Sequence, residues 1–174
     1  NVNLVLHTPG AILSAAWAEA TGGDFRFYVD AMTPGVARVI EALDCERLAV
    51  AAAFGHELPP LIEEMAAIGT VSARDAAAGD LRAAIAGGEA NRSIRAPDSL
   101  AHRYYTEDFG YGLVPLIELA DLAELEVPLA RALTAVAGAA LGQDLLVTGL
   151  NAERLGIAGL DRNGLLALVR GGGE

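Results

Sequence analysis

The chemistry-bearing residues of this chain are concentrated in the run Arg-Tyr-Tyr-Thr-Glu-Asp from Arg103 to Asp108. It brings a guanidinium, two tyrosines and two adjacent carboxylates into a chain dominated by alanine and leucine. Burying so many polar groups is costly unless they satisfy one another. His7 is the second candidate, because imidazole is the side chain best suited to exchanging protons near neutral pH. These residue types favour acid–base chemistry if the fold brings them together.

Helix signals dominate the segments that must position these residues. Thr8-Pro9 is a cap followed by proline at the first helical position, and it predicts a helix to about Glu19. His7 would then lie at the N-terminus of that helix, where the positive end of the helix dipole favours neutral imidazole. Asp108 is expected to begin another helix that runs to about Leu122.

The rest of the chain gives the same kind of signal. Thr33-Pro34 predicts a long helix that ends near Phe54, with Gly55 as its stop. Further expected elements are a helix from Pro59-Pro60 to about Ile68, a capping box at Ser72–Asp75, an irregular segment from Gly87 to Ser99, a helix from Val127-Pro128 to about Leu141, caps at Asn151 and Asp161, and a frayed tail at Gly171–Gly173. Residues 25–29 alternate as one short extended segment would. We therefore predict one all-α domain over residues 1–174, a multi-helix bundle with at most one short strand.

Several stretches, taken in order, resemble the C-terminal helical domain of the opine dehydrogenases, the octopine/nopaline dehydrogenase family. They are Asn1–Gly10, which contains His7, then Phe27–Pro34, Leu43–Leu48, Arg103–Pro115 and Glu153–Ile157. The resemblance runs nearly from end to end. It implies a helical bundle like the C-terminal domain of 6-phosphogluconate dehydrogenase.

The resemblance also implies a reaction. Members of the family join an amino acid to an α-keto acid and reduce the resulting imine with NADH or NADPH. In the matching positions, His7 is the catalytic acid–base group and Asp108 orients it. Arg103 completes the charge network or binds a substrate carboxylate, and Tyr104 is assigned to substrate binding.

Each candidate also has a structural interpretation. His7 could be a histidine bonded beside a helix start, and Asp108 an ordinary N-cap. Arg103 could form a surface salt bridge, and Tyr104 could be a core or rim aromatic. The other weighed residues are expected to be structural: Tyr105 and Tyr111 as aromatics of the core or rim, His56 and His102 as surface groups, Asp44, Glu46 and Arg47 as helix-surface or interdomain ion pairs, Trp17 at the core edge or an interface, and Cys45 as an inert thiol.

The chain lacks the sequence of a dinucleotide site. Such a site needs a strand, a Gly-x-Gly-x-x-Gly turn and a helix, and Gly156–Gly159 has neither the spacing nor a preceding strand. We therefore expect NAD or NADP to bind an N-terminal Rossmann domain that this chain does not contain, and the isolated chain to be inactive. No His-x-x-x-His or Cys-x-x-Cys spacing indicates a metal site.

Composition excludes several partners. The net charge of −11 argues against binding nucleic acid or an anionic membrane, and no apolar run reaches the roughly 18 residues of a membrane span. The lone Cys45 fits a cytoplasmic protein. All 12 basic residues are arginine, which counts against a lysine-dependent relative such as a ketopantoate reductase-like protein. A non-catalytic all-α interaction or dimerisation module remains the rival from another class, and an exposed apolar face could also make the enzyme a homodimer.

Overall fold

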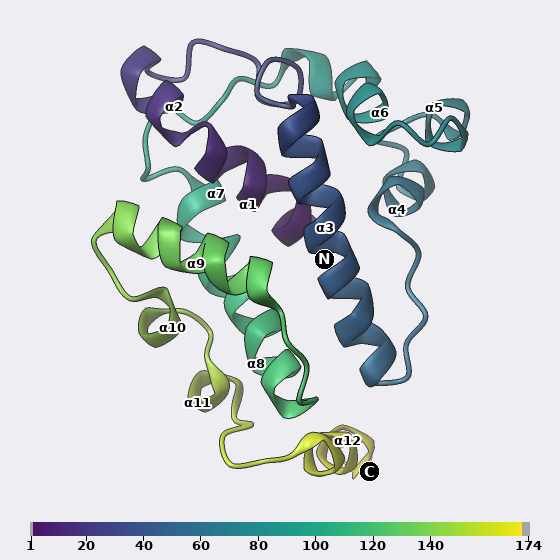
Figure 1. Cartoon of the computed structure of the whole chain (residues 1–174), viewed down its shortest axis with the longest axis vertical. Helices are drawn as coiled ribbons and strands as arrows, with labels where there is room; N and C mark the ends of the chain where they lie inside the picture. The colour runs from purple at the N-terminus through teal and green to yellow at the C-terminus, as the bar shows by residue number, and fades with distance from the viewer. Residues whose placement is uncertain (1, 172–174) are drawn as a thin grey trace.

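The computed structural model describes residues 2–171, and helices form nearly all of its regular structure (Figure 1). In chain order they are α1 (Asn3–Leu13), α2 (Ala15–Thr21), α3 (Pro34–Ala53), α4 (Leu61–Ala67), α5 (Ala73–Ala77), α6 (Leu81–Gly87), the 3₁₀ turn η1 (Asn91–Ser93), α7 (Arg103–Thr106), the π-helix η2 (Phe109–Leu113), α8 (Val114–Leu122), α9 (Pro128–Leu141), α10 (Leu145–Thr148), α11 (Ala152–Leu155) and α12 (Arg162–Gly171). Within residues 2–171 the only strand-like feature is an isolated bridge between Arg26 and Arg95. The all-α prediction is confirmed.

Helix α1 lies at the centre of this arrangement. It packs against α3, α7, α9 and η2, and Figure 1 shows it crossing between the long α3 and the shorter helices on the other side. Every residue from Leu4 to Ala11 is buried. The largest fully buried side chains of the described residues are Val5, Phe27, Met32, Ile40, Leu43, Leu61, Met65, Ile85, Tyr105, Phe109, Leu113 and Ile117. The first residues of the chain are therefore core, and a polar group on α1 must find its partners there.

The predicted start of the first helix is wrong. The helix begins at Asn3, so Pro9 lies inside it, and Thr8 donates its hydroxyl to the carbonyl of Leu4 instead of capping. The predicted end near Glu19 is also wrong, because Ser14 separates α1 from α2. Proline removes one helical hydrogen bond, but burial of the whole helix outweighs that loss. Tertiary packing has overridden a local signal.

The long central helix follows its sequence signals. Thr33 caps α3 by accepting from the amide of Val36, Pro34 opens the helix, and Gly55 adopts the left-handed φ of 81° just past its end. Glu46 on α3 accepts from the first amides of α9, those of Leu129 and Ala130. An acidic side chain at a helix N-terminus satisfies amides that would otherwise lack partners. It thereby ties α9 to α3.

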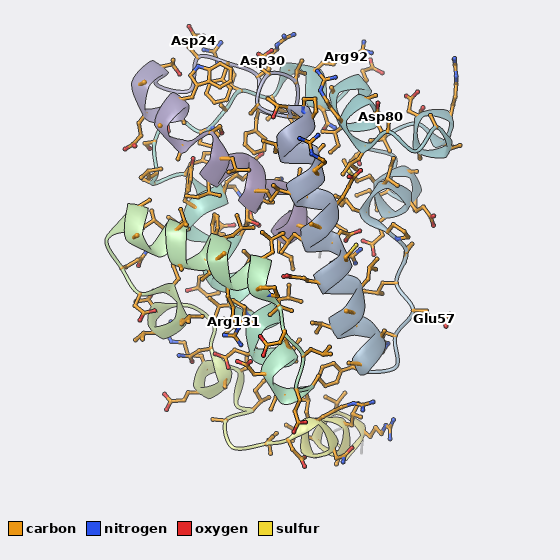
Figure 2. The ribbon with its side chains drawn as sticks, viewed as in Figure 1. Asp24, Asp30, Glu57, Asp80, Arg92 and Arg131 are labelled. Atoms are coloured by element: carbon orange, nitrogen blue, oxygen red, sulfur yellow. The ribbon has the colours of Figure 1, made fainter. Side chains whose placement is uncertain are left out.

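The segment after α2 is not the predicted extended run, because only Arg26 forms a bridge and residues 27–30 turn; charges at the molecular surface hold it. Residue Arg26 forms the bridge to Arg95 and pairs with Asp30, while Arg95 pairs with Asp24 at 2.6 Å. Figure 2 shows Asp24 and Asp30 at the same end of the molecule, with other charged side chains such as Glu57 also pointing outward. These pairs hold the segment in place, and its residue Tyr28 is buried.

The helix predicted from about Asp108 to Leu122 is present, but its first turn is the π-helix η2, which passes directly into α8. The backbone of η2 approaches α1 closely. A Cβ added to Gly112 would stand 2.8 Å from the Cβ of Leu4. Because a side chain at position 112 would collide with Leu4, the glycine lets η2 lie against the helix that carries His7.

The C-terminal third folds back as short helices. Asn151 and Asp161 accept from amides three residues on, as predicted, and Asp144 similarly caps the unpredicted α10. The predicted cap of Ser72 on the amide of Asp75 and the helix after Pro60 are also present. Residues Gly172 and Gly173 of the predicted tail lie outside the described residues.

No single helix within residues 2–171 has the length and apolar composition of a membrane span. The neighbouring segments Pro128–Leu141 and Leu145–Leu155 pass that test only when joined across a bend of 95°.

Candidate active site

A buried histidine–aspartate pair joins the two ends of the candidate set. His7 Nδ1 lies 2.8 Å from Asp108 Oδ2, although the residues are 101 positions apart. Both are almost inaccessible, with 5% and 6% of their surface exposed. Their separation lies within the range of about 2.6–3.2 Å that a positioned acid–base group needs.

The π-helix explains how Asp108 is aimed. The amide of Leu113 donates to the carbonyl of Asp108, five residues back, at 3.1 Å. The Asp108 carboxylate makes no capping bond to the helix that follows, so its interpretation as an N-cap is wrong. Single π turns inside helices are frequent at functional sites. Here the wider turn leaves the carboxylate free to meet His7.

The other nitrogen of His7 is also engaged. Its Nε2 lies 2.7 Å from the hydroxyl of Tyr28, which in turn lies 3.3 Å from the hydroxyl of Tyr104. The Tyr104 ring stacks on the imidazole with centroids 4.0 Å apart and planes 25° apart. The four side chains Asp108, His7, Tyr28 and Tyr104 thus form one continuous polar chain inside the protein.

Chemistry fixes the direction of these bonds. A carboxylate only accepts, so Nδ1–H of His7 donates to Asp108. In neutral imidazole Nε2 then accepts, and the Tyr28 hydroxyl donates to it. Burial first, and then the bond to Tyr104, raise the pKa of Tyr28 above its ordinary value, and burial raises the pKa of Tyr104. Both hydroxyls therefore keep their protons at neutral pH.

The Arg103 guanidinium makes no hydrogen bond or ion pair with the Asp108 carboxylate. Its side chain is 56% exposed, and its Nε lies 3.3 Å from a carboxylate oxygen of Glu107. The guanidinium therefore does not join the charge network of Asp108 by a direct bond, whereas the surface salt bridge is observed. The guanidinium still lies close enough to lower the pKa of Tyr28 slightly against the larger effect of burial. Its assignment to a substrate carboxylate stays a prediction.

The remaining aromatic residues divide as follows. Tyr105 is fully buried and donates its hydroxyl to the carbonyl of Ala11, while Tyr111 is 58% exposed. Trp17 stacks on Phe25 at the edge of the core, with centroids 3.9 Å apart. Neither Tyr105 nor Trp17 is bonded to the set of side chains that runs from Asp108 through His7 to Tyr104. Their structural interpretation holds.

His102 is not the partnerless surface residue that was expected. Its Nδ1 accepts from the amide of Tyr104 at 3.3 Å, and its ring meets the Tyr104 ring edge to face at 4.6 Å. Burial lowers the pKa of His102. The residue caps α7 and supports Tyr104 from outside. His56 is exposed, as predicted.

The prediction of surface or interdomain ion pairs on α3 is wrong for the Asp44–Arg47 pair. Both residues are buried, with Arg47 Nε donating to Asp44 at 2.6 Å. Arg47 also donates to Glu64 and to the carbonyl of Pro59, and Asp44 accepts from the amide of Leu61. These residues attach the loop before α4 to α3. Cys45, beside them, is exposed.

Sequence reasoning missed Tyr28 as a member of the site. The alternation of residues 25–29 predicted that Phe27 and Tyr28 would face opposite sides, yet both are buried. Only its position in the Phe27–Pro34 stretch of the family resemblance singled out this segment. Tyr28 reaches His7 Nε2 only because the fold brings together two residues that are 21 positions apart, and no local sequence pattern predicts that contact.

Neither a metal site nor a dinucleotide site is formed by the described part of the chain. Within residues 2–171, no three His, Cys, Asp or Glu side chains gather as metal ligands would. Gly156 and Gly159 follow the short α11 rather than a strand, so their amides do not form the phosphate cradle that NAD or NADP requires.

The fold and site together define a class: an all-α domain that buries a histidine–aspartate pair suited to acid–base chemistry. Comparison with known families agrees. Residues 1–141 match the family model described as NAD/NADP octopine/nopaline dehydrogenase, alpha-helical domain. The chain belongs to the octopine/nopaline dehydrogenase family, and the resemblance drawn from its residues is confirmed.

Individual relatives extend the match along the chain. Opine dehydrogenase of Arthrobacter sp. (strain 1C) is 32% identical over 169 residues, which cover 97% of this chain and 45% of the relative. Vitopine synthase of Allorhizobium ampelinum is 25% identical over 91% of this chain and 43% of its own length. Protein ocs of Agrobacterium vitis is 29% identical over 98% and 46%. The chain therefore spans about half the length of these curated relatives.

Proposed function

We propose that this chain is the substrate-binding and catalytic half of an NAD(P)H-dependent opine dehydrogenase. Such an enzyme condenses an amino acid with an α-keto acid and reduces the imine to a secondary amine. The observation that carries the proposal is the buried bond of 2.8 Å between His7 and Asp108. Family membership supplies the reaction class.

The geometry suits the proton transfers of this reaction. Condensation expels water, so a proton must reach the departing hydroxyl, and His7 can deliver one as imidazolium. Asp108 holds Nδ1–H and stabilises the positive ring, as the third member of a hydrolase triad does. Because both groups are buried, water screens their attraction little. Asp108 is therefore a positioning residue, and His7 is the acid–base group.

Arg103 supports substrate binding through its position and weak attachment. Exposed ion pairs such as the one with Glu107 contribute about 0–1 kcal/mol, so the guanidinium can exchange Glu107 for a substrate carboxylate at little cost. Guanidinium binds carboxylate in a two-pronged geometry. Tyr104, next to Arg103 and stacked on His7, would line the same place.

The alternatives receive less support. A non-catalytic interaction or dimerisation module has no need to bury His7 against Asp108 across 101 positions. A ketopantoate reductase-like protein is expected to use a lysine, and this sequence has none. The buried pair therefore favours the opine dehydrogenase.

The nicotinamide cofactor belongs to another part of the proposed enzyme. We assign the NAD or NADP site to a Rossmann domain of the same protein, consistent with relatives about twice as long as this chain. The 174-residue chain alone is expected to bind no NADH and to show no dehydrogenase activity. Isothermal calorimetry with NADH checks this, and micromolar binding would contradict it.

Location and assembly complete the proposal. The lone Cys45 supports a reducing compartment such as the cytoplasm. A homodimer is supported by α12, whose Leu168 and Val169 are exposed beside a groove that α3 and α8 also line. Sedimentation of the intact enzyme and of a Val169→Asp variant tests the dimer.

Replacing His7 by alanine in the full-length enzyme tests the proposed function itself. Turnover should fall by roughly 10²–10⁴-fold, the usual contribution of a positioned acid–base group. His56→Ala, at an exposed histidine, is the matched control and should leave turnover unchanged. Steady-state rates of the two variants and the wild type are compared, and the thermal midpoint of each protein is measured to show that it is folded. Wild-type turnover in His7→Ala would remove the proposed function.

A further inference from the structure

Both ring nitrogens of His7 are already bonded, which limits how the residue can act. Nδ1 faces Asp108 at 2.8 Å and Nε2 faces the Tyr28 hydroxyl at 2.7 Å. A ring nitrogen has one in-plane direction for a proton or lone pair, so neither has a free one. Tyr104 covers a face of the ring at 4.0 Å. A substrate atom cannot bond Nε2 while Tyr28 occupies that direction.

We propose that Tyr28 is the hydroxyl through which His7 exchanges its proton, with Tyr104 as the outer member of the relay. This inference rests on the proposed function and deepens it. The Tyr28 bond to Nε2 is short, whereas the separation of 3.3 Å between the two tyrosine oxygens lies at the weak end for hydroxyls. Tyr28 is thus the fixed link and Tyr104 the link that opens and closes.

The relay conserves charge on the tyrosines. A proton leaves an N–H bond of the amino-acid substrate's ammonium group and forms a new O–H bond on Tyr104, whose original proton passes to the Tyr28 oxygen. Tyr28's original proton passes to Nε2. One N–H and two O–H bonds break, and two O–H bonds and one N–H bond form. The positive charge ends on the imidazole beside Asp108, and neither tyrosine becomes an anion. The reverse sequence returns the proton.

The surroundings favour this route over direct access. Tyr28 and Tyr104 are 5% and 7% exposed, so water does not replace their hydroxyls along the chain. Neighbouring α7 presents Arg103 to solvent and Tyr104 to the interior. The outer end of the relay therefore lies beside the residue proposed to hold a substrate carboxylate.

Tyr105 provides a matched control. It is also a buried tyrosine, and its hydroxyl makes one bond, to the carbonyl of Ala11, where that of Tyr28 makes two. The carbonyl of Ala11 keeps a second bond from the amide of Ser14. Tyr105→Phe and Tyr28→Phe thus remove the same atom from the same kind of setting. Only Tyr28→Phe breaks the relay.

The bond to Nε2 can be tested without turnover. Long-range ¹H–¹⁵N NMR of the 174-residue chain should show the His7 proton on Nδ1. The Nε2 resonance should move in Tyr28→Phe and stay in place in Tyr105→Phe. An Nε2 resonance unchanged in Tyr28→Phe would overturn the proposal whatever reaction the enzyme catalyses.

The relay itself is tested in the full-length enzyme by kcat in mixtures of H₂O and D₂O. Wild type should give a curved dependence, because more than one proton moves together. Tyr28→Phe should lose about 10²-fold in kcat and the curvature, while Tyr105→Phe keeps both. Tyr28→Phe behaving like Tyr105→Phe, or a linear wild-type dependence, overturns the relay.

Two further variants keep these outcomes separable. If Tyr28→Phe lowers the thermal midpoint too far to assay, Tyr104→Phe breaks the outer link and should lose the curvature with a smaller loss of kcat. Unaltered curvature there counts against the relay. His7→Ala distinguishes the two proposals: loss of turnover in His7→Ala with a normal Tyr28→Phe rejects the relay alone.

Discussion

Two buried polar clusters in this protein use similar side chains but different partners. In the cluster of Asp44 and Arg47, both residues also bond the backbone, at the amide of Leu61 and the carbonyl of Pro59. In the chain from Asp108 to Tyr104, His7 bonds only side chains, and one of its partners is a hydroxyl. Backbone bonds fix a structure, whereas imidazole and hydroxyls can reverse donor and acceptor. The first cluster holds a loop, and the second has the groups that the proposed proton transfer requires.

The difference also appears in sequence separation. The Asp44–Arg47 pair is made within one helix, and its other bonds span 12 to 17 residues. The His7 cluster is closed over separations of 21, 76 and 101 residues. Local clusters stabilise the element in which they form. Long-range polar contacts form only when the whole domain is folded.

The largest effect is expected at Arg47 and concerns stability. Arg47→Met should lower the free energy of unfolding by about 3–5 kcal/mol, because it leaves the buried Asp44 carboxylate without its counter-charge. Arg131→Met, in the exposed pair with Asp121, should cost only about 0.2–1 kcal/mol. Urea denaturation of the chain compares the two. Equal losses would contradict the structural role assigned to the first cluster.

Asp108→Asn is the matching change in the second cluster and should act mainly on rate. Asparagine fills the same space, and the Asp108 side chain makes no capping bond whose loss would matter. A neutral amide cannot stabilise imidazolium and can hold the wrong tautomer, so kcat should fall about 10²-fold. Thermal midpoint and steady-state rate are measured on one full-length preparation.

Normal turnover together with normal stability in Asp108→Asn would leave His7 without a charge partner in the mechanism. A large loss of stability with normal turnover per folded molecule would place Asp108 beside Asp44 as a structural carboxylate. Either result would erase the contrast between the clusters.

The smallest effect is expected at Arg103. Arg103→Gln should change the free energy of unfolding by no more than about 1 kcal/mol, because its pair with Glu107 is exposed. If it binds a substrate carboxylate, KM for one substrate should rise about tenfold with kcat nearly unchanged, the pattern of lost uniform binding. Arg95→Gln, in another exposed pair, is the control. Identical KM values in both variants would remove Arg103 from the substrate site.

Local signals predicted much of the fold but failed where packing was strongest. Thr33-Pro34 began a helix, because the Thr33 side chain accepts from the amide of Val36 and both Thr33 and Pro34 are exposed. The same dipeptide type at Thr8-Pro9 did not, because that segment is buried on all sides within α1. A cap signal contributes roughly 1 kcal/mol, and burying several apolar side chains contributes more.

The sequence by itself determined the helical class, most helix boundaries and, through the family resemblance, the identity of His7 and Asp108 as the residues to examine. Their actual meeting depended on tertiary structure, since the π-turn at Phe109–Leu113 frees the Asp108 carboxylate and Gly112 lets that turn approach α1. The contact between Tyr28 and His7 likewise depended on tertiary structure. A hydrogen bond depends on the positions of both partner atoms. Helical or alternating periodicity predicts which face of an element a residue occupies, but not which distant group packs against that face.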